Sequence, residues 1–415
     1  MYMAKSFRLS PDDIKTSEQD PLNLFYFGIK SKETQRTMGG SLRRFLVDVC
    51  ADILDGSLRE RAKQFVDIAR KDQEKAVQIL LAYTKLLKAR TILEKSDKNY
   101  LNPSSVPNRI KPIKKLLEMN GVGLGWKRIY STFPEEDNTH RGRGYTRDEI
   151  KILLEHSDGL ETDFIILAFC SGGIRVGAWE GMRWECVFPA YQHGDEFVMT
   201  PAESTMIVCG AMIVYKGTRD EYIALISKEA WNKLELYKKE WMRLMNREPK
   251  DEDPLLLERY KKPKPMTVCA VRTRIEKLVA MSGLRTKQKG KRRYEVPVTH
   301  GFRRFWDKVM METSRKSDKL STLVKKERLL GHDGIVKTDK NYYWTDVMDL
   351  VSDYLIAMPE LTINDEQRLR QQLESENTRV DELAKLRRER EDNAIRLDEL
   401  EAKVQRISKY QLFGT

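Results

Sequence analysis

The chain has 415 residues, of which 40% are hydrophobic and 33% charged, and its formal net charge is +12. This length leaves room for two or three domains. The longest apolar stretch, near residues 164–170, is too short to span a bilayer, and the first residues lack the apolar core of a secretory signal. Five scattered cysteines with no C-x-x-C pair argue against a disulfide framework or a zinc site and favour a reducing intracellular setting.

The positive charge is unevenly distributed along the chain. Residues 284–293 (LRTKQKGKRR) are mostly lysine and arginine, whereas the last fifty residues are nearly balanced. A basic chain with such a cluster is typical of proteins that bind polyanions, although a solvated surface is the alternative interpretation. The members of the cluster expected to contact phosphates are Arg285, Lys287, Lys289, Lys291, Arg292 and Arg293.

The first part of the chain predicts a polar arm and then an all-α domain. Residues 1–20 form the expected arm. From residue 21 to residue 133 the apolar pattern has a helical period, and residues 103–119 form one of the expected helices, ended by Asn120-Gly121. Strand signals are absent from this region. Its basic residues can contact phosphates or be merely solvated, and the candidates are Arg36, Arg43 and Arg44.

A polar segment separates this region from a second domain. Residues 134–144 (PEEDNTHRGRG) lack periodicity and predict an interdomain linker. The capping box Thr146-x-x-Glu149 then marks the first helix of a domain that covers residues 145–363. Strand signals at 206–216 and 221–227 flank a hairpin turn. The predicted fold class is therefore mainly α with a small β-hairpin or sheet.

After a last domain helix near residues 346–358, residues 364–415 predict a charged helical tail. One heptad frame places apolar residues on a common seam, namely Leu369, Leu383, Leu386, Leu397, Leu400, Val404 and Ile407. The same frame also places polar residues there, namely Gln372, Glu376, Arg379, Arg390 and Asn393. This broken seam predicts a long helix that forms a weak coiled coil, and a charged solvated helix is the alternative.

Within the second domain, an ordered set of residues suits chemistry on a phosphodiester. Arg175 follows two glycines after an apolar helix, and a second helix is expected to begin there, beside amides that favour an anion. Lys216 ends a strand just before the hairpin turn, where its ammonium can protonate a leaving oxygen. Each has an ordinary alternative, because Arg175 can pair with Glu180 and Lys216 can be a solvated turn lysine.

Two histidines and an arginine extend the set. His300 and Arg303 are three residues apart on one predicted helix, with Thr299 as the expected N-cap, so both point the same way. His332 follows a Leu-Leu-Gly sequence that marks a helix end. The alternatives are a chance His-x-x-Arg in a basic chain and an ordinary loop histidine.

Two adjacent tyrosines, Tyr342 and Tyr343, precede the last helix of this domain. A free tyrosine has a pKa near 10, so only about a thousandth of it is ionised at neutral pH. It becomes a useful nucleophile where cations stabilise the phenolate, and arginines supply them because they keep their protons. The alternative is an aromatic pair that packs the helix onto the core.

These segments resemble the tyrosine recombinase (phage integrase) family, in particular its archaeal members. The resemblance lies in GIRVGAWEGMRW (173–184), YKG (215–217), HGFR (300–303), LGH (330–332) and NYYWTDVMDLVSDY (341–354). It covers residues 145–363, which would be the catalytic domain, and residues 21–133 resemble the family's core-binding domain more loosely. The charged tail is not part of the general pattern.

The resemblance implies a site-specific recombinase that cleaves and rejoins double-stranded DNA through a 3′-phosphotyrosyl intermediate, without metal, ATP or another cofactor. It implies Arg175 and Arg303 as the clamp on the scissile phosphate, Lys216 as general acid, His300 and His332 as hydrogen-bonding and proton-transfer groups, and Tyr342 as nucleophile, with Tyr343 the second choice. It further implies a homo-oligomer, a tetramer, on a specific recombination site in the cytoplasm or nucleoid, with no membrane.

Two features depart from the family pattern. Ala178 stands where an acidic residue usually follows the first arginine, and the stretch from His332 to Tyr342 is one residue longer than the commonest spacing. They motivate a second interpretation, a catalytically inactive DNA-binding relative that organises DNA or partners through its helical tail. A third, a helical scaffold that binds RNA or acidic partners, lacks any RNA-recognition motif with stacking aromatics.

Overall fold

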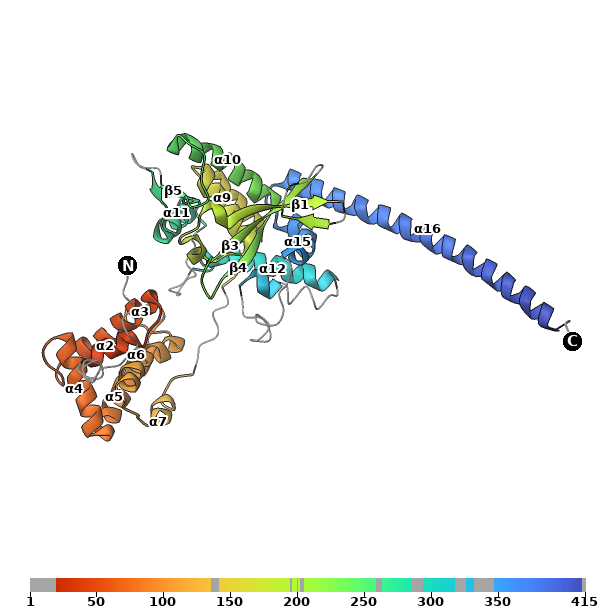
Figure 1. Cartoon of the computed structure of the whole chain (residues 1–415). Coiled ribbons are helices and arrows are strands. Elements are labelled where there is room, and N and C mark those ends of the chain that lie inside the picture. The colour runs from red at the N-terminus through yellow and green to blue at the C-terminus, as the bar shows by residue number, and fades with distance from the viewer. Residues whose placement is uncertain are drawn as a thin grey trace, which may run out of the picture. The chain divides into compact units, whose positions relative to one another are not determined.

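The computed structural model of the chain describes residues 20–135, 142–194, 196–199, 201, 205–258, 263–284, 294–317, 326–331 and 347–412. These residues fall into an N-terminal unit, which ends before Gly142, and a C-terminal unit, which begins there (Figure 1). The described part of the chain is mainly helical with a small antiparallel sheet, which confirms the predicted fold class. None of the described helices combines the length and apolarity needed to cross a bilayer.

The N-terminal unit contains only helices within residues 20–135. They are α2 (Pro21–Phe27), α3 (Lys32–Arg43), the π-helix η1 (Arg44–Val49), α4 (Leu58–Lys71), α5 (Gln73–Thr91), the short 3₁₀ turn η2 (Pro103–Ser105), α6 (Val106–Met119) and α7 (Trp126–Tyr130). Phe25, Phe45 and Phe65 are fully buried in the core. The buried Asn120 side chain donates to the carbonyls of Pro21 at 3.1 Å and Leu116 at 2.8 Å, which fixes the end of α6 against α2.

The C-terminal unit is built around one buried helix, α9 (Leu160–Gly172). Its side chains are apolar nearly all round, as expected of a helix enclosed by other elements. The other helical elements are α8 (Arg147–Glu155), the 3₁₀ turns η3 (Val176–Trp179) and η4 (Trp184–Cys186), α10 (Lys228–Met245), α11 (Val268–Met281), α12 (His300–Ser317), α15 (Val347–Leu361) and α16 (Asp365–Leu412). α9 contacts α10, α12 and the sheet.

The start of the C-terminal unit is fixed by a helix cap and by α12. The predicted capping box is present, with Thr146 Oγ1 accepting from the Glu149 amide at 3.2 Å and Glu149 accepting from the Thr146 amide at 2.8 Å. Just before it, the Gly142 carbonyl accepts a hydrogen bond from Arg304. A Cβ on Gly144 would lie 2.6 Å from the backbone nitrogen of Phe305, so only glycine allows this segment to lie so close to α12.

The sheet has four antiparallel strands in the order β2-β1-β3-β4. They are β1 (Val187–His193), β2 (Glu196–Val198), β3 (Met206–Val214) and β4 (Tyr222–Ile226), and a separate short pair is formed by β5 (Leu257–Glu258) and β6 (Lys264–Pro265). β3 and β4 match the two predicted strands, whereas β1 and β2 were not predicted. Gly210 in β3 lets the Trp231 ring of α10 reach the sheet, because a Cβ there would be 2.5 Å from that ring.

Three helices meet at one carbonyl near the end of α9. The Ser171 carbonyl accepts hydrogen bonds from Trp306 Nε1 of α12 at 2.8 Å and from Tyr354 Oη of α15 at 2.9 Å. Trp306 and Tyr354 are both fully buried. The end of α9, from which Arg175 follows, is therefore held by two helices that come much later in the sequence.

Replacing Trp306 with alanine is expected to lower the unfolding free energy of the C-terminal unit by about 3–5 kcal/mol, because a large buried ring is lost and a cavity forms. Urea denaturation followed by circular dichroism measures the change. Ile356→Ala is the matched control, since Ile356 lies in α15 with 56% of its surface exposed and its loss should cost about 0.5 kcal/mol or less. Equal shifts of the two midpoints would contradict the packing described above.

Candidate active site

Arg175 lies in a tight turn at the end of α9. Gly173 caps the helix in the left-handed conformation with φ 59°, and a Cβ there would lie 2.8 Å from the Trp306 ring. A helical segment does begin at Arg175, as the sequence predicted, but it is the single 3₁₀ turn η3. One short turn has few aligned peptide dipoles, so any anion at Arg175 must be held mainly by side chains.

Arg303 links the end of α9 to the turn before His332. It is half-buried on α12 and donates from Nη1 to the Gly173 carbonyl and from Nη2 to the Leu330 carbonyl, both at 2.7 Å. Gly331 ends the short helical segment with φ 64°, and a Cβ there would lie 2.4 Å from the Tyr222 ring. The predicted helix end at Gly331 is confirmed, whereas His332 lies outside the described residues.

The charge of Arg175 acts on Arg303. Burial lowers the pKa of Arg303, and the charge of Arg175 lowers it further. Asp307 also acts on Arg303, but its carboxylate pairs with Lys326 at 2.7 Å. Among the described residues Arg175 forms no ion pair or hydrogen bond through its side chain, so the predicted alternative of a pair with Glu180 is not seen. Ala178, in the place of the usual acid, is buried. Two close cations of this kind favour an anion between them.

Two tyrosines that the sequence reasoning missed lie beside the arginines. Burial raises the pKa of both Tyr215 and Tyr222, and the charges of Arg175 and Arg303 oppose that rise. Their ring centroids are 6.2 Å apart. The buried Tyr222 hydroxyl makes no well-aligned hydrogen bond to a described residue, although Arg303 is close enough to lower its pKa. The sequence signal for these two tyrosines was their position at the two ends of the hairpin turn that carries Lys216.

Lys216 lies at the hairpin between β3 and β4, as expected, but its ammonium has a partner that the sequence did not reveal. Lys216 Nζ is 2.6 Å from Glu185 Oε2 of η4. This carboxylate raises the pKa of Lys216, and Lys216 in turn lowers the pKa of Glu185. The side chains are 42% and 35% exposed, and an exposed ion pair of this kind is weak and easily exchanged. The ammonium is therefore held by a contact that can be released.

His300 is the first residue of α12, on the same helix as Arg303. Partial burial lowers its pKa, and the charges of Arg303, Arg304 and Arg175 lower it further. Its imidazole is thus neutral at pH 7, because even the unperturbed pKa is near 6.5. A neutral ring can accept a proton at one nitrogen and donate a hydrogen bond from the other.

Arg175→Gln is expected to raise the pKa of His300, because the imidazolium no longer faces the positive charge of Arg175. Titration of the His300 ring by NMR measures the shift. Arg183→Gln is the control, since Arg183 is an exposed arginine whose charge does not act on His300. An unchanged His300 pKa in Arg175→Gln would show that the two residues are not close.

The predicted DNA-contacting arginines of the N-terminal unit are at the surface. Arg36 is exposed and pairs with Glu33 at 3.0 Å, and Arg43 and Arg44 are exposed where α3 ends and η1 begins. A hollow of about 490 Å³ lies between α3 and α6, lined by Thr34, Thr37, Met38, Ser41, Ser105, Asn108, Arg109 and Lys111.

Several predicted residues lie outside the described part of the chain. They are Arg285, Lys287, Lys289, Lys291, Arg292 and Arg293 of the basic cluster, together with His332, Tyr342 and Tyr343. Within the described residues, the site brings Arg175, His300 and Arg303 together. No group of three or more His, Cys, Asp or Glu suited to a metal ion occurs among those residues.

Comparison with known proteins gives matches of structure only. No protein-family model and no curated protein matches the chain. The structure is similar to the XerH site-specific recombinase bound to difH substrate, with 12% identity, coverage of 81% of this chain and 97% of that chain, and a TM-score of 0.36. It is also similar to the Tn1549 transposon integrase in complex with transposon right end DNA (12% identity, 80% and 98% coverage, TM-score 0.42). A third similar structure is a lambda integrase dimer bound to a COC′ core site, with 14% identity, coverage of 82% of this chain and 84% of that chain, and a TM-score of 0.37. At these TM-scores the likenesses do not define the chemistry of the site.

Proposed function

We propose that the chain is a site-specific DNA recombinase of the tyrosine type, related to the archaeal integrases. The observation that carries the proposal is the electropositive site in which Arg303 donates to the Gly173 carbonyl, two residues before Arg175, and the charges of both arginines act on His300. In the transition state of phosphoryl transfer the phosphate carries extra negative charge, and paired guanidiniums stabilise that charge without a metal ion. The sequence supplies the tyrosine, the lysine and the second histidine in the order that this chemistry needs.

The cleavage step follows from the roles of these groups. Arg175 and Arg303 hold the non-bridging oxygens of the scissile phosphate. The phenol oxygen of Tyr342 forms a bond to phosphorus as the bond to the 5′-oxygen breaks, and the phenol proton passes to a neutral imidazole, such as that of His300. Lys216 leaves Glu185 and gives a proton to the 5′-oxygen. Attack by a 5′-hydroxyl from another strand reverses these transfers and rejoins the DNA.

The rest of the chain binds and arranges the DNA. Residues 21–133 act as a core-binding domain with Arg36, Arg43 and Arg44 on phosphates, and residues 145–363 act as the catalytic domain. The basic cluster at 285–293 contributes further phosphate contacts. Four protomers on two duplexes complete recombination at a specific site in the cytoplasm or nucleoid. His332 and the tyrosines follow the Leu330-Gly331 turn that Arg303 holds.

Trapping the covalent intermediate tests the proposal. The chain first selects duplexes from a randomised pool, and a selected duplex nicked near its centre then serves as suicide substrate. The expected product is a protein–DNA adduct that survives denaturant, is digested by protease, carries the tyrosine on a 3′-phosphate, and forms in EDTA without ATP. Tight binding to a selected duplex with no adduct would overturn the proposal.

That negative result would favour a second candidate, a catalytically inactive DNA-binding relative that organises DNA or partners through its tail. Two observations favour it: Ala178 replaces the usual acid, and the Lys216 ammonium is paired with Glu185. Such a protein binds DNA in a salt-sensitive manner and cuts no strand. Recombinant products from a two-site plasmid would dismiss it.

A further inference from the structure

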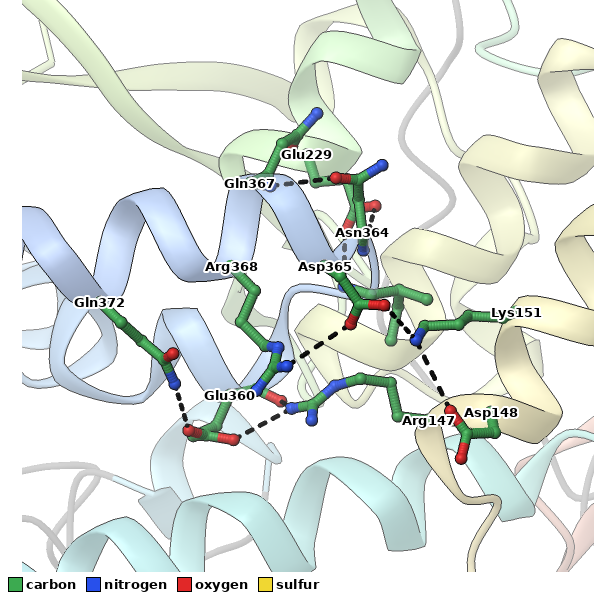
Figure 2. Close-up of polar contacts among 11 residues, drawn as sticks. Arg147, Asp148, Lys151, Glu229, Glu360, Asn364, Asp365, Gln367, Arg368 and Gln372 are labelled. Carbon is green, nitrogen blue, oxygen red and sulfur yellow. Dashed lines mark hydrogen bonds and ion pairs between the residues drawn. The ribbon is translucent and has the colours of Figure 1, made fainter.

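The last helix, α16, is anchored to the C-terminal unit at its first turn (Figure 2). The buried Glu229 of α10 accepts hydrogen bonds from the amides of Ile363 at 2.8 Å and Asn364 at 3.0 Å. Asn364 caps the helix by accepting from the Gln367 amide at 3.0 Å. Lys151 of α8 pairs with Asp365 at 2.7 Å. The direction in which α16 leaves the unit is thus set by contacts from two other helices.

A second set of contacts holds the next turns against α15. Glu360 accepts from Arg147 of α8 at 3.0 Å and from the Gln372 side chain at 2.9 Å (Figure 2). Thr362 Oγ1 lies 2.9 Å from the Gln371 side chain. Gln371 and Gln372 are the last half-buried residues before the helix extends outward.

Beyond Gln372 the described side chains of the helix are exposed. From Leu373 to Glu401, every residue whose side chain the structure describes is exposed, and α16 extends away from the rest of its unit (Figure 1). Large apolar residues of this segment are 56–63% exposed, namely Leu373, Val380, Leu383, Leu386, Ile395, Leu397 and Leu400. Helices in proteins take most of their stability from packing of an apolar face. A helix of this length with an exposed leucine seam is therefore built to pack against a partner.

The seam is defined by six residues of the middle of the helix: Leu383, Leu386, Arg390, Asn393, Leu397 and Leu400. Their spacing alternates 3 and 4, and at 3.6 residues per turn they lie within a sector of about 100°. Ile395 lies on the opposite side of the helix. The seam is symmetric about its middle, since two leucines, two polar residues and two leucines follow one another.

This symmetry favours the antiparallel orientation when two copies of the helix pair with each other. In an antiparallel pair centred between residues 391 and 392, Leu383 faces Leu400 and Leu386 faces Leu397 of the second copy. Arg390 then faces Asn393, and no layer holds two like charges. In a parallel pair, Arg390 would face its own copy in the core, which is unfavourable.

The charges at the outer ends of the seam agree with the antiparallel pair. Residues 374–382 carry four acids and one base, 385–390 four bases and one acid, 391–401 five acids and one base, and 403–409 three bases. Antiparallel pairing about the same centre sets the acidic stretch 374–382 against 401–409, which carries three bases and one acid, and sets 385–390 against 393–398, which carries one base and one acid. A parallel pair also gains some favourable contacts, such as Arg396 beside Glu401, so the core layers decide the orientation.

We propose that α16 forms an antiparallel two-helix coiled coil with α16 of a second copy of this chain, centred between Glu391 and Asp392. The exposed seam of one copy is thus covered by the same seam of the second copy, which runs in the opposite direction. The pairing is a property of the full chain without DNA and does not depend on the proposed recombinase activity.

Analytical ultracentrifugation of the full chain without DNA tests the self-association. The wild-type chain is expected to be a dimer, and Leu386→Asp is expected to raise the dissociation constant about 100-fold or more, because each dimer loses two leucine layers. Ile395→Asp is the matched control: Ile395 is as exposed as Leu386, on the same helix, but lies off the seam, so this variant should stay dimeric. A monomeric wild type, or equal effects of the two variants, would overturn the proposal.

Disulfide trapping tests the orientation in a Cys269→Ser background, since Cys269 is the exposed cysteine among the described residues. Chains carrying Leu383→Cys and chains carrying Leu400→Cys are oxidised separately and mixed. The mixture is expected to give a mixed disulfide dimer, whereas each variant alone should not crosslink, because like positions would be about 25 Å apart. Crosslinking of each variant alone would show a parallel pair and overturn the proposal, as would no crosslink in any sample.

Discussion

Arg175→Ala is expected to slow formation of the covalent adduct by about 10²–10³-fold while leaving the unfolding free energy nearly unchanged. Loss of one group that stabilises developing charge has a kinetic effect of this size. The fold should tolerate the change, because the Arg175 side chain makes no hydrogen bond or ion pair to the described residues. Single-turnover cleavage of the suicide substrate and urea denaturation provide the two measurements.

Arg303→Ala is expected to differ from Arg175→Ala in the urea denaturation. Cleavage should fall by a similar factor, but the unfolding free energy should also fall, by about 1.5–3 kcal/mol, because the Arg303 guanidinium binds the carbonyls of Gly173 and Leu330. Arg183→Ala, at an exposed arginine, serves as control and should change neither quantity. If Arg175→Ala unfolds as easily as Arg303→Ala, the assignment of a structural role to Arg303 alone is wrong.

Tyr342→Phe is expected to abolish the adduct, because the phenylalanine ring has no oxygen to attack phosphorus. Tyr343→Phe should leave the adduct yield within a few-fold of wild type, since the spacing from His332 favours Tyr342 as the nucleophile. Both variants keep the aromatic ring, so equal denaturation curves are expected and make the comparison fair. An adduct in Tyr342→Phe but not in Tyr343→Phe would reverse the assignment, and an adduct in the double variant would exclude both residues.

The elements that the sequence predicted well are those with strong local signals. The capping box at Thr146 and Glu149 formed as expected, because both partners lie within one turn. The strand β1 was missed because it contains Pro189, which usually breaks a ladder. In the described part of the chain, Pro189 pairs with Gly210 of β3, and β2 pairs with β1 from Tyr191 to His193. The helix expected after Arg175 is a single 3₁₀ turn, and Gly181 with φ 69° follows its end.

The residue types of the candidate site were named from the sequence, whereas its contacts were not. Arg175, His300 and Arg303 were named from order and spacing, and in the structure the charges of the two arginines act on His300. The Glu185 partner of Lys216 is 31 residues away in the chain, and no local pattern announces such a pairing. The same holds for the Leu330 carbonyl that accepts from Arg303, because long-range contacts depend on how the helices pack.

The anchored base of α16 gives the proposed dimer a fixed reach. From Asp365 to the centre of the coiled coil is about 40 Å at 1.5 Å per residue, so the two anchoring points would be about 80 Å apart. Because Glu229 and Lys151 fix how each helix leaves its unit, the pair would work as a molecular ruler instead of a tether. Its span is a little over two turns of duplex DNA. Adding or removing a whole heptad between the anchored base and Leu383 would lengthen or shorten that ruler in both copies without changing its seam.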